Sequence, residues 1–133
     1  MSLGISEAFD LRPDYIISVI KDTRAKLVGF QFPEGLKRKG PELAKKVEKA
    51  TGAEIIISGG DPCFGACDLD RTLLDHVDIL FHFGHAELED IRLSNKVYFI
   101  ETRSSVDVLH VIEKAVPELK GQKIADHYCS ARP

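Results

Sequence analysis

Short apolar runs alternate with longer amphipathic stretches along this chain, and that alternation limits the possible folds more than any other feature. The apolar runs have strand length and are rich in β-branched or aromatic residues; they cover residues 26–32, 53–58, 77–83 and 96–101. Helices are predicted between and around them, over residues 13–21, 36–51 and 104–116, with a short one after residue 68. Apolar strands that alternate with helices are typical of a parallel sheet covered on both faces. The sequence therefore predicts a three-layer, Rossmann-like α/β domain with a four-stranded parallel sheet.

Each predicted helix carries an apolar stripe that is expected to face the sheet. The last helix should be capped by Ser104 or Ser105 and end at Pro117, with a core stripe of Val108, Leu109, Ile112 and Ala115. The short helix should bury Leu69, Leu73 and Leu74. The second helix opens with the basic segment Leu36–Lys39, which could hold an anion at a helix N-terminus, although a solvated basic face is the favoured interpretation.

Chain length and charge restrict the organisation and the partners. The 133 residues suit one compact domain, expected over residues 1–124, with an irregular tail over residues 125–133. The net charge of −3 at pH 7 gives no broad basic surface for nucleic acid or an anionic membrane. No apolar run reaches the roughly 18 residues of a spanning helix, and no secretion signal opens the chain, so a cytoplasmic location is expected.

The residues with chemical potential follow the predicted strands. Because the carboxyl ends of parallel strands share one edge of a sheet, four segments should meet there. These segments are Phe32–Gly35, Gly59–Asp68, His82–Glu87 and Glu101–Ser104. A ligand site is therefore expected at this edge.

Cys63 and Cys67 lie in the second of these segments, which is rich in glycine and proline. Three cysteines in all, with Cys129 the third, do not make a disulfide framework, and clustered thiols in a reducing compartment serve metal or redox chemistry. Two small buried thiols lining a turn are an equally weighted alternative.

His82, His85 and Glu87 follow the third strand. With the two cysteines they would suit a zinc site, although His82 is expected to be an interior histidine and His85 the functional candidate. Thiol catalysis by Cys67 with His85 stays open. The chain contains no G-x-S-x-G, no G-x-G-x-x-G and no phosphate-binding loop motif, so hydrolase and nucleotide-binding functions lack support.

Three motifs together carry a resemblance to a known family. They are Phe30-Gln-Phe-Pro-Glu-Gly-Leu36, Gly60-Asp-Pro-Cys-Phe-Gly-Ala-Cys-Asp-Leu69 and His82-Phe-Gly-His-Ala-Glu87. In this order and spacing they resemble the amino-terminal domain of the archaeal diphthamide synthesis enzymes, the 2-(3-amino-3-carboxypropyl)histidine synthases, over roughly residues 15–116. Residues 1–124 are therefore expected to correspond to the first domain of that family.

The resemblance implies a non-classical radical S-adenosylmethionine enzyme. Three α/β domains of that family each give one cysteine to a [4Fe–4S] cluster, and the enzyme works as a homodimer. It cleaves S-adenosylmethionine to a 3-amino-3-carboxypropyl radical, which is added to a histidine of translation elongation factor 2. By the same resemblance Cys67 is the expected cluster ligand, Cys63 is its neighbour or fallback, and the pocket candidates are Glu34, Gly35, Asp61, His85 and Glu87.

The chain departs from the family pattern after residue 124, because residues 125–133 do not resemble the start of a second domain. A frameshift or truncation is one explanation, and further domains or a second subunit would then supply the other cluster ligands. The isolated chain is expected to be inactive. A small zinc-binding module and a non-catalytic interaction domain remain the alternatives.

Overall fold

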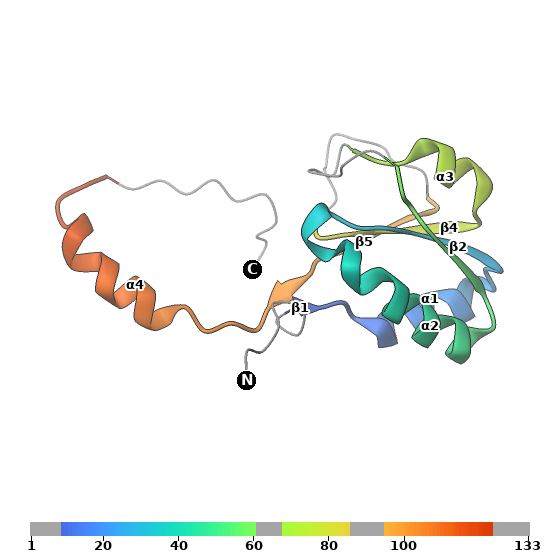
Figure 1. Cartoon of the computed structure of the whole chain (residues 1–133), viewed down its shortest axis with the longest axis horizontal. Helices are drawn as coiled ribbons and strands as arrows, with labels where there is room; N and C mark the ends of the chain where they lie inside the picture. The colour runs from blue at the N-terminus through green and yellow to red at the C-terminus, as the bar shows by residue number, and fades with distance from the viewer. Residues whose placement is uncertain (1–8, 61–67, 86–94, 124–133) are drawn as a thin grey trace.

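A four-stranded parallel sheet forms the centre of the protein (Figure 1). The computed structural model describes residues 9–60, 68–85 and 95–123. The sheet has the order β3-β2-β4-β5, and its strands are β2 (Leu27–Gln31), β3 (Glu54–Ile57), β4 (Ile79–Phe83) and β5 (Val97–Ile100). All three pairings are parallel. The predicted α/β fold with a four-stranded parallel sheet is confirmed, and the strand ends share one edge as expected.

Helices α1 (Pro13–Thr23) and α2 (Gly40–Thr51) lie together on one face of the sheet (Figure 1). Proline stands in the first turn of each helix, where its missing N–H costs nothing. Gly52 ends α2 with a left-handed φ of 73°, and its N–H donates to the carbonyl of Glu48. Both helices were predicted from their apolar stripes, and the buried side chains Ile16, Val19 and Val47 belong to those stripes.

The core beneath these helices is an aromatic cluster. Phe30, Phe32, Phe81 and Phe83 are each at most 1% exposed. The rings of Phe32 and Phe83 stack with centroids 4.3 Å apart, and Phe30 meets both of them edge-on. This packing locks β2 against β4 next to the carboxyl edge.

The short helix α3 (Arg71–His76) covers the opposite face (Figure 1). Leu73 lies directly over Gly29 of β2: a Cβ added at Gly29 would be only 3.2 Å from the Leu73 side chain. Leu69, Leu73 and Leu74 are half-buried, not buried as expected. A six-residue helix is too short to seal a sheet face.

The second helix differs from its prediction at its start. Residues 36–39 belong to a 3-10 helix, η2 (Glu34–Lys39), and α2 begins only at Gly40. Pro41 accounts for this boundary, since proline favours the first turn of a helix and disfavours its interior. The basic segment Leu36–Lys39 therefore does not form the first turn of α2, and Lys37 pairs with Glu34.

The last helix also differs. It forms as α4 (Leu109–Ala115), continued by the 3-10 helix η3 (Val116–Leu119), and it stands away from the sheet (Figure 1). The predicted core stripe is wrong: Val108, Leu109 and Ile112 are each more than half exposed. The predicted serine cap is wrong as well, because Asp107 accepts the N–H of Leu109. Pro117 does not end the helical segment but lies inside η3.

A small two-stranded sheet accounts for the position of α4 away from the central sheet. Strand β6 (Arg103–Ser104) pairs antiparallel with β1 (Phe9–Asp10), so the chain leaving β5 is held by the N-terminal segment. This pairing directs the chain away from the sheet before α4 begins (Figure 1). Within the described residues, no helix is long and apolar enough to cross a membrane.

Candidate functional site

The carboxyl edge of the sheet joins two of the three sequence motifs. Gly84 follows β4 with a φ of +82°, and a Cβ at this position would lie 2.8 Å from Cγ of Pro33. The N–H of Gly84 donates to the carbonyl of Ile100 at 2.8 Å. Only glycine fits such a conformation and approach without strain, so the ends of β2, β4 and β5 are packed closely here.

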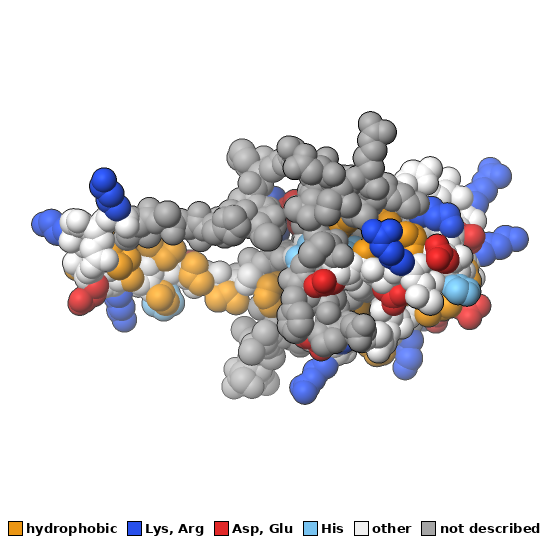
Figure 2. Space-filling model, turned by 90° about the horizontal axis from the view of Figure 1, so that it is seen from above, with side chains coloured by type: hydrophobic (Ala, Val, Ile, Leu, Met, Phe, Trp, Pro, Cys, Tyr) orange, Lys and Arg blue, Asp and Glu red, His pale blue; other side chains and the backbone are white. Residues whose placement is uncertain are grey.

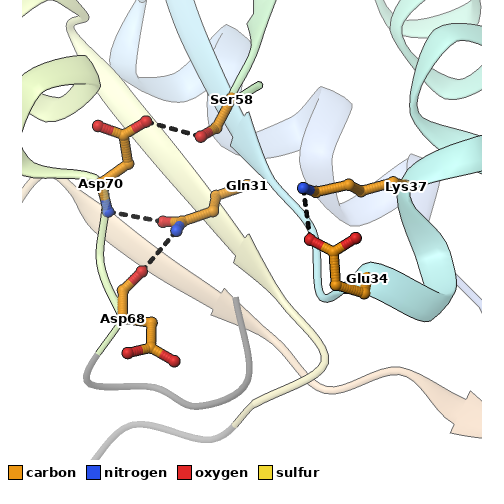
Figure 3. Close-up of polar contacts among 6 residues, drawn as sticks. All are labelled: Gln31, Glu34, Lys37, Ser58, Asp68 and Asp70. Carbon is orange, nitrogen blue, oxygen red and sulfur yellow. Dashed lines mark hydrogen bonds and ion pairs between the residues drawn. The ribbon is translucent and has the colours of Figure 1, made fainter. Parts of the chain in front are cut away.

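Gln31, the last residue of β2, is the central polar group of the site (Figure 3). It is 4% exposed. Its Nε2 donates to the carbonyl of Asp68 at 2.6 Å, and its Oε1 accepts the N–H of Asp70 at 2.9 Å. One buried amide thus holds the chain on the carboxyl side of residues 61–67.

Asp70 extends this network to the other side of the same segment. Its Oδ1 accepts the N–H of Leu73 at 2.9 Å, which caps α3, and its Oδ2 accepts the hydroxyl of Ser58 at 2.6 Å. Ser58 follows β3 directly and its N–H donates to the carbonyl of Phe30. The chain is therefore fixed both before and after the segment that carries the cysteines.

His82 lies beside Gln31 because the two residues are register partners in β2 and β4. It is fully buried, and its Nδ1 is 3.1 Å from Oε1 of Gln31. That oxygen can only accept, so Nδ1 carries a proton. The ring of half-buried His85 follows at 5.2 Å between centroids, and Phe99 packs against His82 from β5.

An open hollow of about 810 Å³ lies between the end of β3 and α3. Ser58, Gly59 and Gly60 line one side, and Asp68, Asp70 and Leu73 line the other. Ser58, Asp68 and Asp70 belong to the hydrogen-bond network beside the cysteine segment, so the hollow borders the predicted site. Arg71, Thr72 and His76 add further polar groups to its lining.

The predicted site residues divide into two groups. Asp61, Cys63, Cys67 and Glu87 lie outside the described residues. Glu34 is exposed at the start of η2, where its carboxylate pairs with Lys37 at 2.5 Å, and Gly35 beside it is also exposed (Figure 3). His85 lies at the edge as predicted. The charged pair Glu101 and Arg103 also follows a strand, and its closest atoms are 3.7 Å apart.

Metal-binding capacity within the described ranges is limited. Across residues 9–60, 68–85 and 95–123, no three His, Cys, Asp or Glu side chains form a group that could hold a metal ion. The zinc alternative would combine His82 and His85 with the two cysteines outside these ranges.

Gln31, Ser58 and Asp70 were not recognised as site residues from the sequence. Gln31 could have been noticed, because it is the one polar side chain in the apolar run Leu27–Phe32 of a strand predicted to be covered on both faces. A buried amide needs partners, and its partners could only come from the loops at the same edge. Ser58 and Asp70 carry no comparable signal, since both residue types are common beside loops.

Comparison with known proteins gives one family. Residues 32–128 match the family model described as "Putative diphthamide synthesis protein". The matched range includes the first motif from Phe32 onward and the whole of the other two motifs, and it continues past α4.

Curated relatives carry consistent names. The chain is 34% identical over 113 residues to the 2-(3-amino-3-carboxypropyl)histidine synthase of Pyrococcus horikoshii. This alignment covers 82% of this chain and 32% of that protein. The chain is 32% identical over 108 residues to subunit 1 of the synthase of Encephalitozoon cuniculi, covering 80% of this chain and 30% of that protein. The chain thus spans about a third of the length of these relatives.

A solved structure agrees with the sequence matches. The crystal structure of Dph2 from Pyrococcus horikoshii with a 4Fe-4S cluster superposes with a TM-score of 0.72 at 31% identity, over 84% of this chain and 33% of that one. Fold and sequence therefore point to the same proteins.

Proposed function

Because this chain belongs to the diphthamide synthesis family, we propose that it forms the first domain of a 2-(3-amino-3-carboxypropyl)histidine synthase. Such an enzyme transfers a 3-amino-3-carboxypropyl group from S-adenosylmethionine to a histidine of translation elongation factor 2. The observation that carries the proposal is the family match over residues 32–128, which coincides with a superposition on a cluster-containing relative. Other domains, or a second subunit, would supply the remaining cluster ligands, because this chain spans only about a third of the length of its relatives.

The donor set of this chain suits an iron–sulfur cluster. Thiolates are the usual ligands of such clusters, and Cys63 and Cys67 are the two cysteines between Gly60 and Asp68. The described residues on both sides of them, Ser58 and Asp68, lie beside the carboxyl edge of the sheet and are held by hydrogen bonds. We assign Cys67 as the ligand and Cys63 as its neighbour or fallback. When bound, the cluster supplies the electron that cleaves S-adenosylmethionine.

The remaining residues of the edge shape and polarise the site. Gln31, Asp70 and Ser58 fix the backbone, while the aromatic core beneath β2 and β4 keeps water from that side. His85, with Glu34, Gly35, Asp61 and Glu87, forms the candidate pocket for the polar groups of S-adenosylmethionine. The Glu34 carboxylate pairs with Lys37 through Oε1, and its second oxygen would be a further acceptor for a cationic amino group.

The proposal is tested by exchanging domains between this protein and its relative. Residues 9–123 would replace the matching third of the Pyrococcus horikoshii synthase. Transfer is measured as the mass increase of elongation factor 2 after anaerobic incubation with S-adenosylmethionine and a reductant. We expect modification by the chimaera and none by the isolated 133-residue chain.

Two controls make the test specific. The same chimaera with Cys67→Ser should be inactive, whereas Cys129 lies outside the exchanged segment and cannot contribute. A well-folded chimaera that carries stoichiometric zinc and transfers nothing would favour the zinc-binding module, for which the closeness of His82 and His85 is the supporting observation.

A further inference from the structure

We propose that the outer surface of α1 and α2 is a docking site for an acidic segment of a partner protein. This basic surface consists of five exposed residues, Lys21 and Arg24 at the end of α1 and Lys45, Lys46 and Lys49 on α2. It lies on the face of the sheet opposite α3, and therefore apart from the hollow beside the predicted site (Figure 1). Such docking would be independent of the proposed function.

Charge is unevenly distributed along the chain. Nine of its 18 Lys and Arg residues lie between Lys21 and Lys49, but only four of its 21 Asp and Glu residues do. This segment is therefore positively charged in a protein whose net charge is −3 at pH 7. A local field of one sign attracts partners of the opposite sign even when the net charge of the protein does not.

Three lysines on α2 repel one another. Lys49 follows Lys45 by four residues and Lys46 by three, so their ammonium groups project from neighbouring positions on the same side of the helix. No ion pair within the described residues involves any of them. Like charges at this spacing destabilise a helix, so the stability of α2 does not explain their arrangement.

The two carboxylates of α2 do not neutralise these lysines. Glu48 is turned towards the sheet, since its Oε1 accepts the N–H of Ile55 at 3.1 Å. Glu42 lies in the first turn, where a negative charge stabilises the helix N-terminus. Neither carboxylate forms an ion pair in the part of the chain that the structure describes. The exposed side of α2 is therefore positive from Lys45 onward.

Arg24 ends α1 in a conformation that is unusual for arginine. Its φ of 55° is left-handed, a conformation in which glycine usually ends a helix. Gly52 ends the neighbouring α2 in this way with a φ of 73°, and both residues border one hollow of about 300 Å³. Lys21 already supplies the cation that favours a helix C-terminus. Arg24 therefore accepts backbone strain that its own helix does not require, and it places a guanidinium beside the hollow.

An acidic protein segment suits this surface better than nucleic acid does. A helix of 12 residues is about 18 Å long, which matches about six residues of extended peptide. A nucleic acid strand would continue past α2 over parts of the protein where acidic residues outnumber basic ones, and their repulsion acts over about 8 Å at physiological salt. Residues 16–24 and 40–51 also contain no aromatic ring on which a base could stack.

The first test measures the binding of a fluorescently labelled hexaglutamate peptide to the full 133-residue chain by fluorescence anisotropy. The test variant removes three charges from the basic surface through Lys45→Gln, Lys46→Gln and Lys49→Gln. The control variant removes three charges from exposed positions on and after α4 through Lys114→Gln, Lys120→Gln and Lys123→Gln. Both variants have the same net charge. The test variant should bind the peptide about fivefold more weakly than the parent, and the control variant should stay within about twofold.

The stability of the test variant checks that weaker binding is not a folding defect. The variant should unfold at the same urea concentration as the parent or at a higher one, because like-charge repulsion is removed and glutamine has a helix propensity similar to that of lysine. Weaker binding accompanied by a lower unfolding midpoint would overturn the docking role.

Arg24→Gly separates binding from folding. Glycine relieves the left-handed conformation, so the urea midpoint should rise, while the loss of one cation should weaken peptide binding about twofold. An arginine with a purely structural role would give the reverse result, which is a lower midpoint with unchanged binding.

Two further measurements identify the occupant and the place of binding. A labelled hexauridylate should bind the parent about fivefold more weakly than the hexaglutamate peptide does. Carbodiimide coupling of the peptide, followed by mass spectrometry, should link it to Lys45, Lys46 or Lys49 in preference to the lysines changed in the control variant.

Any of four results would overturn the docking role. These are no saturable peptide binding by the parent, an equal loss of binding in the test and control variants, hexauridylate binding as tight as peptide binding, and coupling confined to lysines outside the basic surface. None of these measurements involves the cluster or the transfer reaction, so each result leaves the proposed function as it stands.

Discussion

At the residue scale, glycine and glutamine shape the edge of the sheet more than charged groups do. Gly84 allows β4 to pass against Pro33, and Gln31 holds the chain that follows the cysteine segment. Neither Gly84 nor Gln31 is charged, so neither is an obvious candidate for a site residue in the sequence. Gly84 and Gln31 do lie within the family motifs, which indicates that those motifs contain structural residues as well as candidate ligands.

Gly84→Ala should be clearly destabilising. The substitution forces a side chain into a φ of +82° and against Pro33, at a combined cost of about 1–3 kcal/mol in the free energy of unfolding. Urea denaturation measures this change. Gly52→Ala is the matched control, since Gly52 shares the positive φ of 73° but has no atom within 4 Å of the added Cβ. Equal costs for the two variants would show that the contact with Pro33 contributes nothing.

At the element scale, one carboxylate joins the beginnings of β2 and β4. Oδ2 of Asp78 accepts the N–H groups of Lys26 and Leu27 at 2.9 and 3.0 Å, and the Asp78 N–H donates to Leu27. These backbone hydrogen bonds, first that from Leu27 and then that from Lys26, lower the pKa of Asp78 below its usual 3.8. The contact lies at the edge opposite the candidate site, so changes here should affect stability and leave the site chemistry alone.

The stability contribution of Asp78 should depend on pH in a defined direction. Because the pKa of Asp78 is lower in the folded protein, its stabilisation is present above pH 3.8 and disappears as the pH falls through the folded value. Asp78→Asn should therefore unfold more easily than the parent at pH 6, and the difference should shrink as the pH falls below 3.8. Urea titrations at several pH values measure it, with Asp75→Asn on α3 as the control. A difference that is constant with pH would contradict this account.

The sequence predicts the elements of this fold better than their packing. The strands were found because β2 and β4 are buried along nearly their whole length and are therefore largely apolar, with Gln31 and His82 as the exceptions. The apolar stripe of α4 was also found, but a stripe does not specify which surface covers it, and the β1–β6 pairing depends on partners far apart in the chain. Gln31 was missed although it stands out as a polar side chain in an apolar run, because its partners Asp68 and Asp70 lie far from it in the chain and could not be named from the sequence.

At the scale of the whole molecule, α4 and the residues around it leave an apolar surface open. It comprises Val106, Val108, Leu109, Val111, Ile112, Val116 and Leu119, each 38–58% exposed. Figure 2 shows such side chains along the arm that leaves the body. Soluble monomers seldom expose a contiguous apolar surface of this kind, so it should promote association when the chain is isolated.

The isolated chain should accordingly change its apparent mass with concentration. Leu109→Glu combined with Ile112→Glu should reduce the association, because both side chains are more than half exposed and carry little folding energy here. Light scattering coupled to gel filtration over a range of concentrations gives the measurement. A parent chain that stays monomeric at every concentration would contradict the expectation, as would a double variant that associates equally well.

The central claim is that this domain contributes Cys67 to an iron–sulfur cluster completed by other domains. Its most direct test is the iron and acid-labile sulfide content of the anaerobically purified chimaera, compared between the parent, Cys67→Ala and Cys63→Ala. Our account predicts about four iron and four sulfide per chimaera for the parent. It predicts near-complete loss in Cys67→Ala and substantial retention in Cys63→Ala. Full cluster content in Cys67→Ala would contradict it.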